Sequence, residues 1–310
     1  MQTVFCELKG QALIAFSGED AAAFLHAQLT SDIMALAADR TQYGGYCSPK
    51  GRLLATLLLW RRPADILLQL PRDLREGVQE RLSRYVLRSR VRITDASEQL
   101  RVFGIAGAGA ASIVSTVGAA DLVAAHESVD ADAARITRLP GMRYVAITEA
   151  ERASSLRERL GKHAQQQAES LWTRLDIEAG VPSITAATQE QYVPQMVNLD
   201  LIGGVSYSKG CYPGQEIVAR MHYLGRLKQR MYRVRVITTD RVSPGDALFS
   251  PDFGAEQASG SIVQAVACED GAHEALAVVQ IGSARSGALR FKSLNGPVLE
   301  LLSLPYAIPS

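Results

Sequence analysis

One loop of eight residues, 209–216 (Lys-Gly-Cys-Tyr-Pro-Gly-Gln-Glu), holds the densest set of chemically active side chains in the sequence. Cys211 offers a thiol and Lys209 a cation, while Gln215 and Glu216 offer hydrogen-bonding groups that can contact the edge of a heterocycle. Two glycines in the loop suit close backbone approach or a positive φ angle. The loop is therefore the first candidate for a binding or catalytic site.

From the last residue of the loop onward, residues 216–223 carry apolar side chains at helical spacing. We expect a helix there, with Pro213 in its first turn and Gly225 as its stop signal. Cys211 then lies just ahead of a helix N-terminus, where the partial positive charge, together with Lys209, lowers the pKa of a thiol and raises its reactivity. The alternative is a capped turn around a buried cysteine, and the residues alone leave both interpretations open.

Two further segments carry polar groups upstream of the loop. In residues 171–180, Arg174 and Glu178 are four positions apart, so on a helix they can form a surface ion pair worth roughly 0.2–0.5 kcal/mol. That structural role is the simpler interpretation if the segment stands alone. Residues 193–199 read as an extended, amide-bearing segment that leads towards the loop and includes Asn198.

Composition sets the class of protein. The chain has 310 residues, 47% hydrophobic and 21% charged, which predicts a globular protein of two or three structural units. The net charge of +1 gives no overall field that would select nucleic acid or an anionic membrane. The longest apolar stretch, residues 53–60, is too short to span a bilayer, so we expect no membrane association.

Cysteine and histidine usage points to a reducing compartment and away from a metal site. The four cysteines lie far apart, form no CxxC pair and follow no signal peptide, so we expect reduced thiols in a cytoplasmic protein. The five histidines are dispersed, and none has a partner at metal-ligand spacing. We therefore predict no metal site.

The N-terminal pattern mixes strands and helices. A capping-box pattern at Ser17 and Asp20 predicts a helix with apolar residues continuing to position 36. Further strands are expected at residues 12–16, 53–60, 66–70, 101–105 and 143–147, and helices at 72–88, 110–117 and 149–160. This order suggests an α+β split sheet of ferredoxin-like character.

Beyond residue 225 the pattern changes to short strands. They are expected at residues 232–236, 247–250, 260–268, 275–281 and 298–302, with glycine and proline turns and no helix. This texture suggests a small β-barrel. We predict one region over residues 1–225 and a C-terminal barrel domain over residues 226–310.

Taken together, the segments resemble the YgfZ-type folate-binding proteins, relatives of the glycine-cleavage T-protein, an aminomethyltransferase. The resemblance rests on residues 16–36, the turn at 51–53, and residues 175–182, 194–199 and 209–216. The last segment is highly specific for the YgfZ branch, whereas Glu178-Ala179-Gly180 is shared with the T-protein. The resemblance implies a three-lobed ring around a folate pocket, with two interleaved N-terminal lobes and a C-terminal barrel.

The resemblance also implies a cofactor and its binding residues. Glu178 matches the T-protein glutamate that binds the pterin ring, and a carboxylate can accept two hydrogen bonds from an aminopyrimidine edge. The cofactor would be tetrahydrofolate or a one-carbon derivative. The other residues assigned to its site are Asn198, Lys209, Tyr212, Gln215, Glu216 and Arg220, with Cys211 as a reactive thiol.

One departure from the T-protein pattern bears on catalysis. The T-protein strand after the glycine turn carries acidic residues, including the carboxylate credited with catalysis. Here Ala55 and Thr56 stand at about those positions, and no Asp or Glu lies between Gly51 and Trp60. Neither side chain can hold the charge needed to stabilise a developing cation or move a proton. We therefore do not expect aminomethyl transfer from glycine.

The family is associated with assembly or repair of iron–sulfur clusters in client enzymes and, through them, with tRNA modification. That role is implied by resemblance alone, since one isolated cysteine cannot hold a cluster that needs four ligands. The first alternative is a true tetrahydrofolate-dependent one-carbon transferase with its acid elsewhere. The second is an RNA-binding protein, motivated by basic residues between positions 220 and 235, although neutral charge and few stacking aromatics argue against direct RNA binding.

Overall fold

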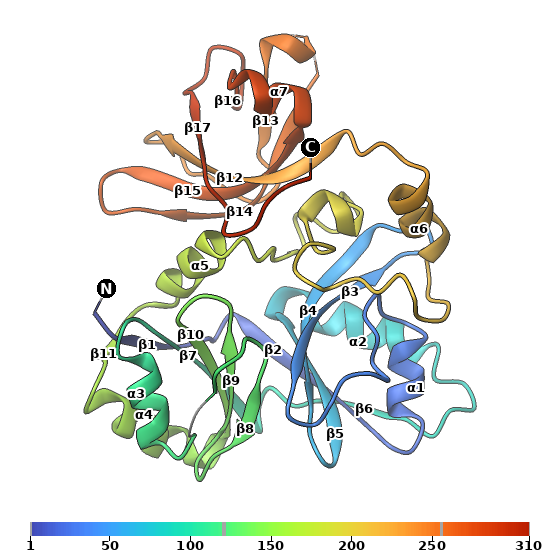
Figure 1. Ribbon diagram of the computed structural model, residues 1–310, viewed down its shortest axis with the longest axis vertical. Coiled ribbons are helices and arrows are strands. Elements are labelled where there is room, and N and C mark those ends of the chain that lie inside the picture. The colour runs from blue at the N-terminus through green and yellow to red at the C-terminus, as the bar shows by residue number, and fades with distance from the viewer. Residues whose placement is uncertain (1, 120–121, 255–256, 310) are drawn as a thin grey trace. The chain divides into compact units, whose positions relative to one another are not determined.

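The computed structural model describes residues 2–119, 122–254 and 257–309 (Figure 1). The chain divides into two compact units that are each assembled from separate stretches of sequence. The first comprises Met1–Gln28, Asp32–Tyr43 and Leu57–Trp172, and the second comprises Leu29–Ser31, Gly44–Thr56 and Thr173–Ser310. The boundary predicted at residues 225–226 falls inside the second unit and stays a prediction about domain organisation.

A six-stranded sheet with the order β11-β1-β7-β10-β9-β8 lies in the first unit. Its strands are β1 (Val4–Glu7), β7 (Leu100–Ala106), β8 (Ser128–Asp130), β9 (Arg135–Leu139), β10 (Arg143–Glu149) and β11 (Gln165–Gln166). Two helices, α3 (Ala110–Thr116) and α4 (Ala153–Gly161), lie beside this sheet, and α4 follows a 3₁₀ turn, η2 (Ala150–Arg152) (Figure 1). Their apolar faces form one core with Phe103 and Ile105 of the sheet, because each helix places buried residues at helical spacing.

The second sheet has five strands in the order β3-β4-β5-β2-β6. They are β2 (Gln11–Ser17), β3 (Thr41–Cys47), β4 (Leu53–Arg61), β5 (Asp65–Pro71) and β6 (Arg92–Asp95). The associated helices are α1 (Ala21–His26) and α2 (Arg75–Ser83), the latter preceded by a 3₁₀ turn, η1 (Arg72–Leu74). Strand β4 is buried along all but its last residue, which explains why its buried residues are apolar apart from Thr56.

The second unit contains the segments that carry the candidate site. Helix α5 (Glu169–Glu178) leads into it, followed by the 3₁₀ turn η3 (Pro194–Val197) and helix α6 (Gln215–Tyr223). The chain then forms an antiparallel sheet in the order β16-β13-β14-β15-β12-β17. Its strands are β12 (Gln229–Ile237), β13 (Ala247–Phe249), β14 (Gly260–Ala267), β15 (Ala272–Gln280), β16 (Arg290–Phe291) and β17 (Leu299–Leu302).

The C-terminal sheet confirms the strand pattern predicted beyond residue 225. A bulge between Ile262 and Gln264 interrupts the pairing of β14 with β15, and bulges increase the local bend and twist of a sheet. The sheet curls around one apolar core. The expectation that this region has no helix was wrong, because α7 (Ile281–Ser286) follows β15 directly and buries Ala284. A 3₁₀ turn, η4 (Pro251–Phe253), follows β13.

The predicted N-terminal strands are confirmed, but they belong to two sheets. Strands β4 and β5 lie in the five-stranded sheet, whereas β7 and β10 lie in the six-stranded sheet. Sequence order alone does not reveal this division, because each strand buries a similar apolar run.

Two predicted helices are shorter in the structure. The first was expected to reach position 36, but α1 ends at His26, and the Asp20 carboxylate accepts a hydrogen bond from the Arg90 backbone N–H (2.7 Å) instead of capping the helix. Leu29, Ile33 and Leu36 are buried outside any helix. The helix expected over residues 72–88 ends, as α2, at Ser83.

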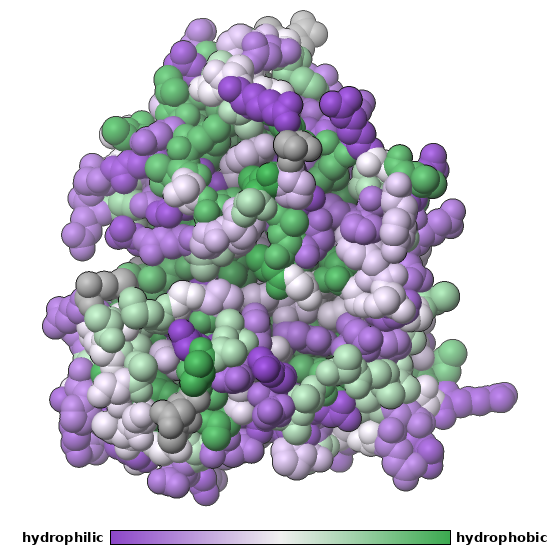
Figure 2. Space-filling model, in the orientation of Figure 1, coloured by the Kyte–Doolittle hydropathy of each residue, from purple (hydrophilic) through white to green (hydrophobic). Residues whose placement is uncertain are grey.

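Among the described residues, no helix has the length and apolar character that crossing a bilayer requires. The face seen in Figure 2 mixes hydrophilic and hydrophobic side chains. Within the same residues, no group of three or more His, Cys, Asp and Glu side chains is arranged to hold a metal ion.

Candidate functional site

The loop at residues 209–214 precedes α6 and packs against the turn between β3 and β4. Gly214 is the N-cap of α6 with φ +80°, and a Cβ atom there would lie 2.5 Å from the Ser48 carbonyl oxygen and the Gly51 Cα. Gly51 has φ +69°. Side chains are strained in this conformation and would collide at this contact, so the two glycines allow the loop and the turn to touch. The predicted need for glycine at position 214 is confirmed.

Helix α6 starts later than the prediction that placed Pro213 in its first turn. The helix begins at Gln215, so Pro213 precedes the N-cap rather than occupying the first helical turn. The positive φ of Gly214 is the reason, since a helix cannot continue backwards through that conformation. Cys211 lies three residues before the N-cap and is exposed.

Lys209 and Tyr212 anchor the loop within the second unit. The Lys209 side chain is buried, its ammonium donates a hydrogen bond to the Leu29 carbonyl (2.7 Å), and it lies 4.9 Å from the centre of the Tyr212 ring. Tyr212 is buried as well, and burial, followed by the nearby Cys47, raises the pKa of its hydroxyl. These contacts fix the loop; the predicted effect of Lys209 on the Cys211 thiol stays a prediction.

The four cysteines differ in accessibility. Cys6 and Cys47 are buried, Cys268 is partly exposed and Cys211 is exposed. Burial raises the pKa of Cys47, and burial together with the charge of Glu274 raises that of Cys268. Both effects disfavour the reactive thiolate at those two positions.

Along α6, the remaining predicted site residues are accessible. Gln215 is partly exposed and its side-chain amide donates a long hydrogen bond to the Gly210 carbonyl (3.4 Å). Glu216 and Arg220 are exposed. Gln215 thus remains accessible beside the loop, while Glu216 and Arg220 present their charges to solvent.

Asn198 is a buried structural node. It adopts a left-handed conformation (φ 58°), which asparagine tolerates, and its amide donates to the Met231 carbonyl (2.8 Å). Its side-chain oxygen accepts from Arg230 (3.3 Å), which also forms a two-bond ion pair with Asp200 (2.8 and 3.1 Å). The side chain is fully buried, so these contacts give it a positioning role beneath the loop.

Sequence reasoning missed three residues of this node. Arg230 was considered only as one of the basic residues between positions 220 and 235, but it is 8% exposed and lies in β12. Its partner Asp200 is thirty positions away, and no local spacing rule links such residues. Gln195 was not singled out either: it is buried and donates to the Val218 carbonyl of α6 (2.7 Å) and to the Tyr207 hydroxyl (3.2 Å).

An aromatic cluster joins Tyr207, ahead of the loop, to the last turn of α6. The Tyr207 ring stacks on His222 with 3.7 Å between ring centres, and Tyr223 contacts both rings edge-on. Burial, followed by the charge of Asp200, raises the pKa of Tyr207 to about 12, so its hydroxyl stays protonated and can donate a hydrogen bond.

Glu178 ends α5 and belongs to a charged cluster. The predicted pair forms, with the Arg174 Nε donating to Glu178 Oε1 (3.0 Å), and Arg233 Nη2 lies 3.9 Å from the same oxygen. Arg233 also pairs with the buried Glu274 (2.6 Å). The pair is therefore part of a network rather than an isolated surface contact. Among the described residues, Glu178 Oε2 has no hydrogen-bond partner, and the side chain is 33% exposed.

Ala55 and Thr56, the two positions that the resemblance compares with the T-protein carboxylates, are buried. Ala55 is fully buried, and Thr56 is 7% exposed with its hydroxyl accepting a hydrogen bond from the Ile184 backbone N–H (3.0 Å). The Thr56 hydroxyl therefore fixes the backbone at Ile184, in the segment that follows α5.

The basic residues that motivated an RNA-binding alternative are partly neutralised. Arg230, Arg233 and Arg235 form ion pairs with Asp200, Glu274 and Asp270. Arg220, Arg226 and Lys228 are exposed, and within the described parts of the chain they form no ion pair. Only part of the predicted basic segment is thus available for phosphate contacts.

Comparison with known proteins gives consistent matches. Residues 3–152 match a family model described as the GCVT N-terminal domain. The chain is 31% identical over 299 residues to tRNA-modifying protein YgfZ from Yersinia enterocolitica, which covers 96% of this chain and 90% of that protein. It is 30% identical over 306 residues to the protein of the same name from Sodalis glossinidius, with coverage of 97% and 92%.

Among solved structures, glycine cleavage system aminomethyltransferase T from Bartonella henselae matches with a TM-score of 0.80. The match covers 98% of this chain and 86% of that one at 16% identity, which shows a shared fold alone. The predicted α+β, T-protein-like fold class is confirmed. Since identity to the YgfZ proteins extends over nearly the whole of both chains, the chain belongs to the YgfZ family.

Proposed function

We propose that this protein binds tetrahydrofolate or a one-carbon derivative and supports iron–sulfur cluster assembly or repair in client enzymes. Through those clients it would affect tRNA modification indirectly. The name of its relatives, tRNA-modifying protein YgfZ, and the GCVT domain match support a folate-related role in tRNA modification. The finer assignment rests on the residues of the second unit.

The folate proposal depends on the hydrogen bonding of the Glu178 carboxylate. Arg174 holds one carboxylate oxygen, and the other has no hydrogen-bond partner among the described residues. An aminopyrimidine presents adjacent N–H donors, and bonds from such donors to a carboxylate are of the stronger, charge-assisted kind. The donor chemistry of a reduced pterin therefore fits this oxygen. When bound, tetrahydrofolate would supply a carrier for one-carbon units.

The remaining folate-site residues divide by role. Glu216, Arg220 and Gln215 are accessible and are proposed to contact the ligand directly. Lys209, Tyr212 and Asn198 are buried, and we propose that they act mainly by holding the loop in position.

Cys211 carries the proposed link to iron–sulfur chemistry. It is the exposed cysteine of the four, on a loop whose backbone is fixed on both sides. A single thiol cannot hold a conventional cluster, which needs four ligands. We therefore propose that it acts in redox or transient chemistry, or shares a cluster with a partner that supplies the other ligands.

Calorimetry with tetrahydrofolate and its one-carbon derivatives, under anaerobic conditions, tests the folate half of the proposal. Saturable one-site binding is expected. Absence of binding to every derivative would remove it. The iron–sulfur half is tested separately, by measuring client-enzyme activity in cells that carry Cys211→Ser, which keeps a small polar group and removes the thiolate. Unchanged client activity would exclude a role for the thiol.

A further inference from the structure

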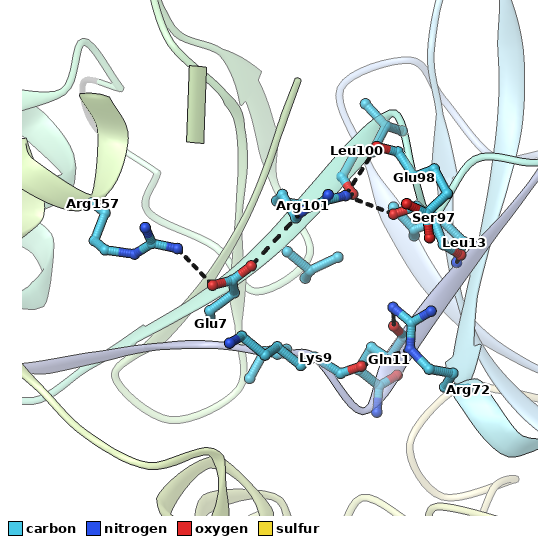
Figure 3. Close-up of a pocket in the computed structure, with 12 residues that line it drawn as sticks. Glu7, Lys9, Gln11, Leu13, Arg72, Ser97, Glu98, Leu100, Arg101 and Arg157 are labelled. Atoms are coloured by element: carbon cyan, nitrogen blue, oxygen red, sulfur yellow. Dashed lines mark hydrogen bonds and ion pairs between the residues drawn. The ribbon is translucent and has the colours of Figure 1, made fainter. Parts of the chain in front are cut away.

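A polar pocket of about 530 Å³ lies in the first unit (Figure 3). Residues of β1, the β1–β2 connection, β2, the 3₁₀ turn η1, the β6–β7 connection, the start of β7 and helix α4 line it. All of them belong to the first unit, whereas every residue proposed for folate binding belongs to the second. None of the residues that line the pocket is therefore among those proposed to bind folate. Its volume lies within the range of small-molecule sites.

The lining carries an excess of positive charge. Lys9, Arg72, Arg101 and Arg157 contribute four cations, against two carboxylates, of which Glu7 is the more buried. Arg157 and Arg101 lie on either side of Glu7, at 2.6 and 3.9 Å from its oxygens (Figure 3). One carboxylate thus faces two guanidinium groups.

Two of the arginines, Arg72 and Arg101, donate hydrogen bonds to backbone carbonyls, and Arg101 has the Glu7 ion pair in addition. Arg72 donates to the carbonyls of Lys9 (2.7 Å) and Gln11 (3.1 Å). Arg101 donates through Nη1 to the carbonyls of Ser97 (2.7 Å) and Glu98 (3.1 Å). Carbonyl oxygens fix the orientation of a guanidinium group but carry no net charge. Arg72 makes no ion pair within the described residues, so its charge is uncompensated by direct contact.

A purely structural role accounts for part of this arrangement, because Arg72 and Arg101 pin the two turns that border the pocket. It does not account for Lys9. That side chain is exposed, and its ammonium makes no hydrogen bond or ion pair with another described residue. Each guanidinium has five N–H donors, and the carbonyl contacts of Arg72 and Arg101 use only some of them. The structural role therefore leaves donors on both arginines that a ligand could use.

We propose that this pocket binds a small anion with several oxygen atoms, either a phosphoryl group or a polycarboxylate. Both present clustered oxygens that planar guanidinium groups contact through paired N–H donors, with Lys9 adding a point charge. The guanidinium groups of Arg72 and Arg101 are already oriented, so little ordering is needed on binding.

Calorimetry with the full-length protein at low ionic strength tests the proposal, with pyrophosphate as the phosphoryl probe and tri-glutamate as the polycarboxylate probe. Saturable binding of either supports the site and identifies its ligand class. Lys9→Gln removes one charge without removing a fold contact, and we expect about three- to tenfold weaker binding. Arg72→Gln should weaken binding further.

Arg84→Gln is the matched control, because Arg84 is an exposed arginine of the same unit that does not line the pocket. Its binding should equal that of the unaltered protein. The proposal is overturned if neither probe binds, if Lys9→Gln leaves affinity unchanged, or if Arg84→Gln weakens binding as much as Lys9→Gln does. Binding of tRNA without binding of either probe would also overturn it, since it would assign the charge to a nucleic-acid surface.

Discussion

Replacing Glu178 by alanine should separate ligand affinity from stability. The Arg174–Glu178 contact joins two side chains that are 44% and 33% exposed, so its loss should lower the free energy of unfolding by only about 0.5 kcal/mol. A hydrogen bond to a charged group contributes about 1.5–3 kcal/mol to binding. We therefore expect tetrahydrofolate to bind on the order of 10- to 150-fold more weakly to a normally folded variant.

Two measurements test the expected loss of affinity and the expected small loss of stability. Anaerobic calorimetry gives the affinity for tetrahydrofolate, and urea unfolding of the ligand-free protein gives the stability. Glu178→Gln keeps one side-chain acceptor and should lose less affinity than Glu178→Ala. Glu300→Ala is a matched control, because Glu300 is an exposed glutamate on β17 of the same unit.

Two results would refute the reasoning. If Glu178→Ala binds tetrahydrofolate as tightly as the unaltered protein, the pterin is held elsewhere. If the variant loses several kcal/mol of stability, Glu178 is mainly a structural member of the cluster with Arg233 and Glu274, and any loss of binding would follow from misfolding.

Four further predictions concern other residues of the protein and its expected lack of aminomethyl transfer. Cys211 should be alkylated first of the four thiols, as peptide mass spectrometry will show; faster labelling of Cys47 would contradict its burial. Arg230→Met should cost about 3–5 kcal/mol in urea unfolding by leaving Asp200 buried without its partner; a cost below 1 kcal/mol would show that the ion pair is dispensable. Burial, followed by nearby arginines, lowers the pKa of His126 to about 4 from 6.5, so unfolded chains take up a proton at higher pH. Stability should therefore fall between about pH 6.5 and 4, by at most about 3 kcal/mol, and a His126→Asn variant that shows an equal fall would exclude this histidine as the cause. Finally, the protein should release no ammonia from carrier-bound aminomethyl groups when mixed with the other glycine-cleavage components, and measured turnover would overturn that expectation.

Local signals predicted the strands well and the helix lengths poorly. Strands β4 and β5 are recognisable because a strand buried on both faces is mostly apolar, here with only Thr56 and Gln69 as buried polar residues. The same logic failed after α1. Leu29, Ile33 and Leu36 have helical spacing and are all buried, yet none lies in a helix. Their spacing reflects burial of irregular chain, which periodicity cannot distinguish from an amphipathic helix.

The candidate site divides in the same way. The glycine at position 214 was predictable because a loop-to-helix turn needs a conformation that other residues rarely adopt. The node of Asn198, Asp200 and Arg230 was not predictable, because its members meet only after β12 has docked beside η3. A basic residue in an apparent linker gives no sign that it will be buried against a distant carboxylate.

The Thr56 hydroxyl has a structural role in the buried part of β4. In the T-protein, the resemblance places a catalytic carboxylate at about this part of the strand. Here the Thr56 hydroxyl accepts a hydrogen bond from the Ile184 backbone N–H (3.0 Å), and both residues are buried. An unsatisfied buried N–H would cost about 1–3 kcal/mol, so this position needs an acceptor whatever the protein does. A hydroxyl meets that structural need without placing an ionised group on the strand near neutral pH, which is the physical basis for our expectation that the protein does not transfer aminomethyl groups.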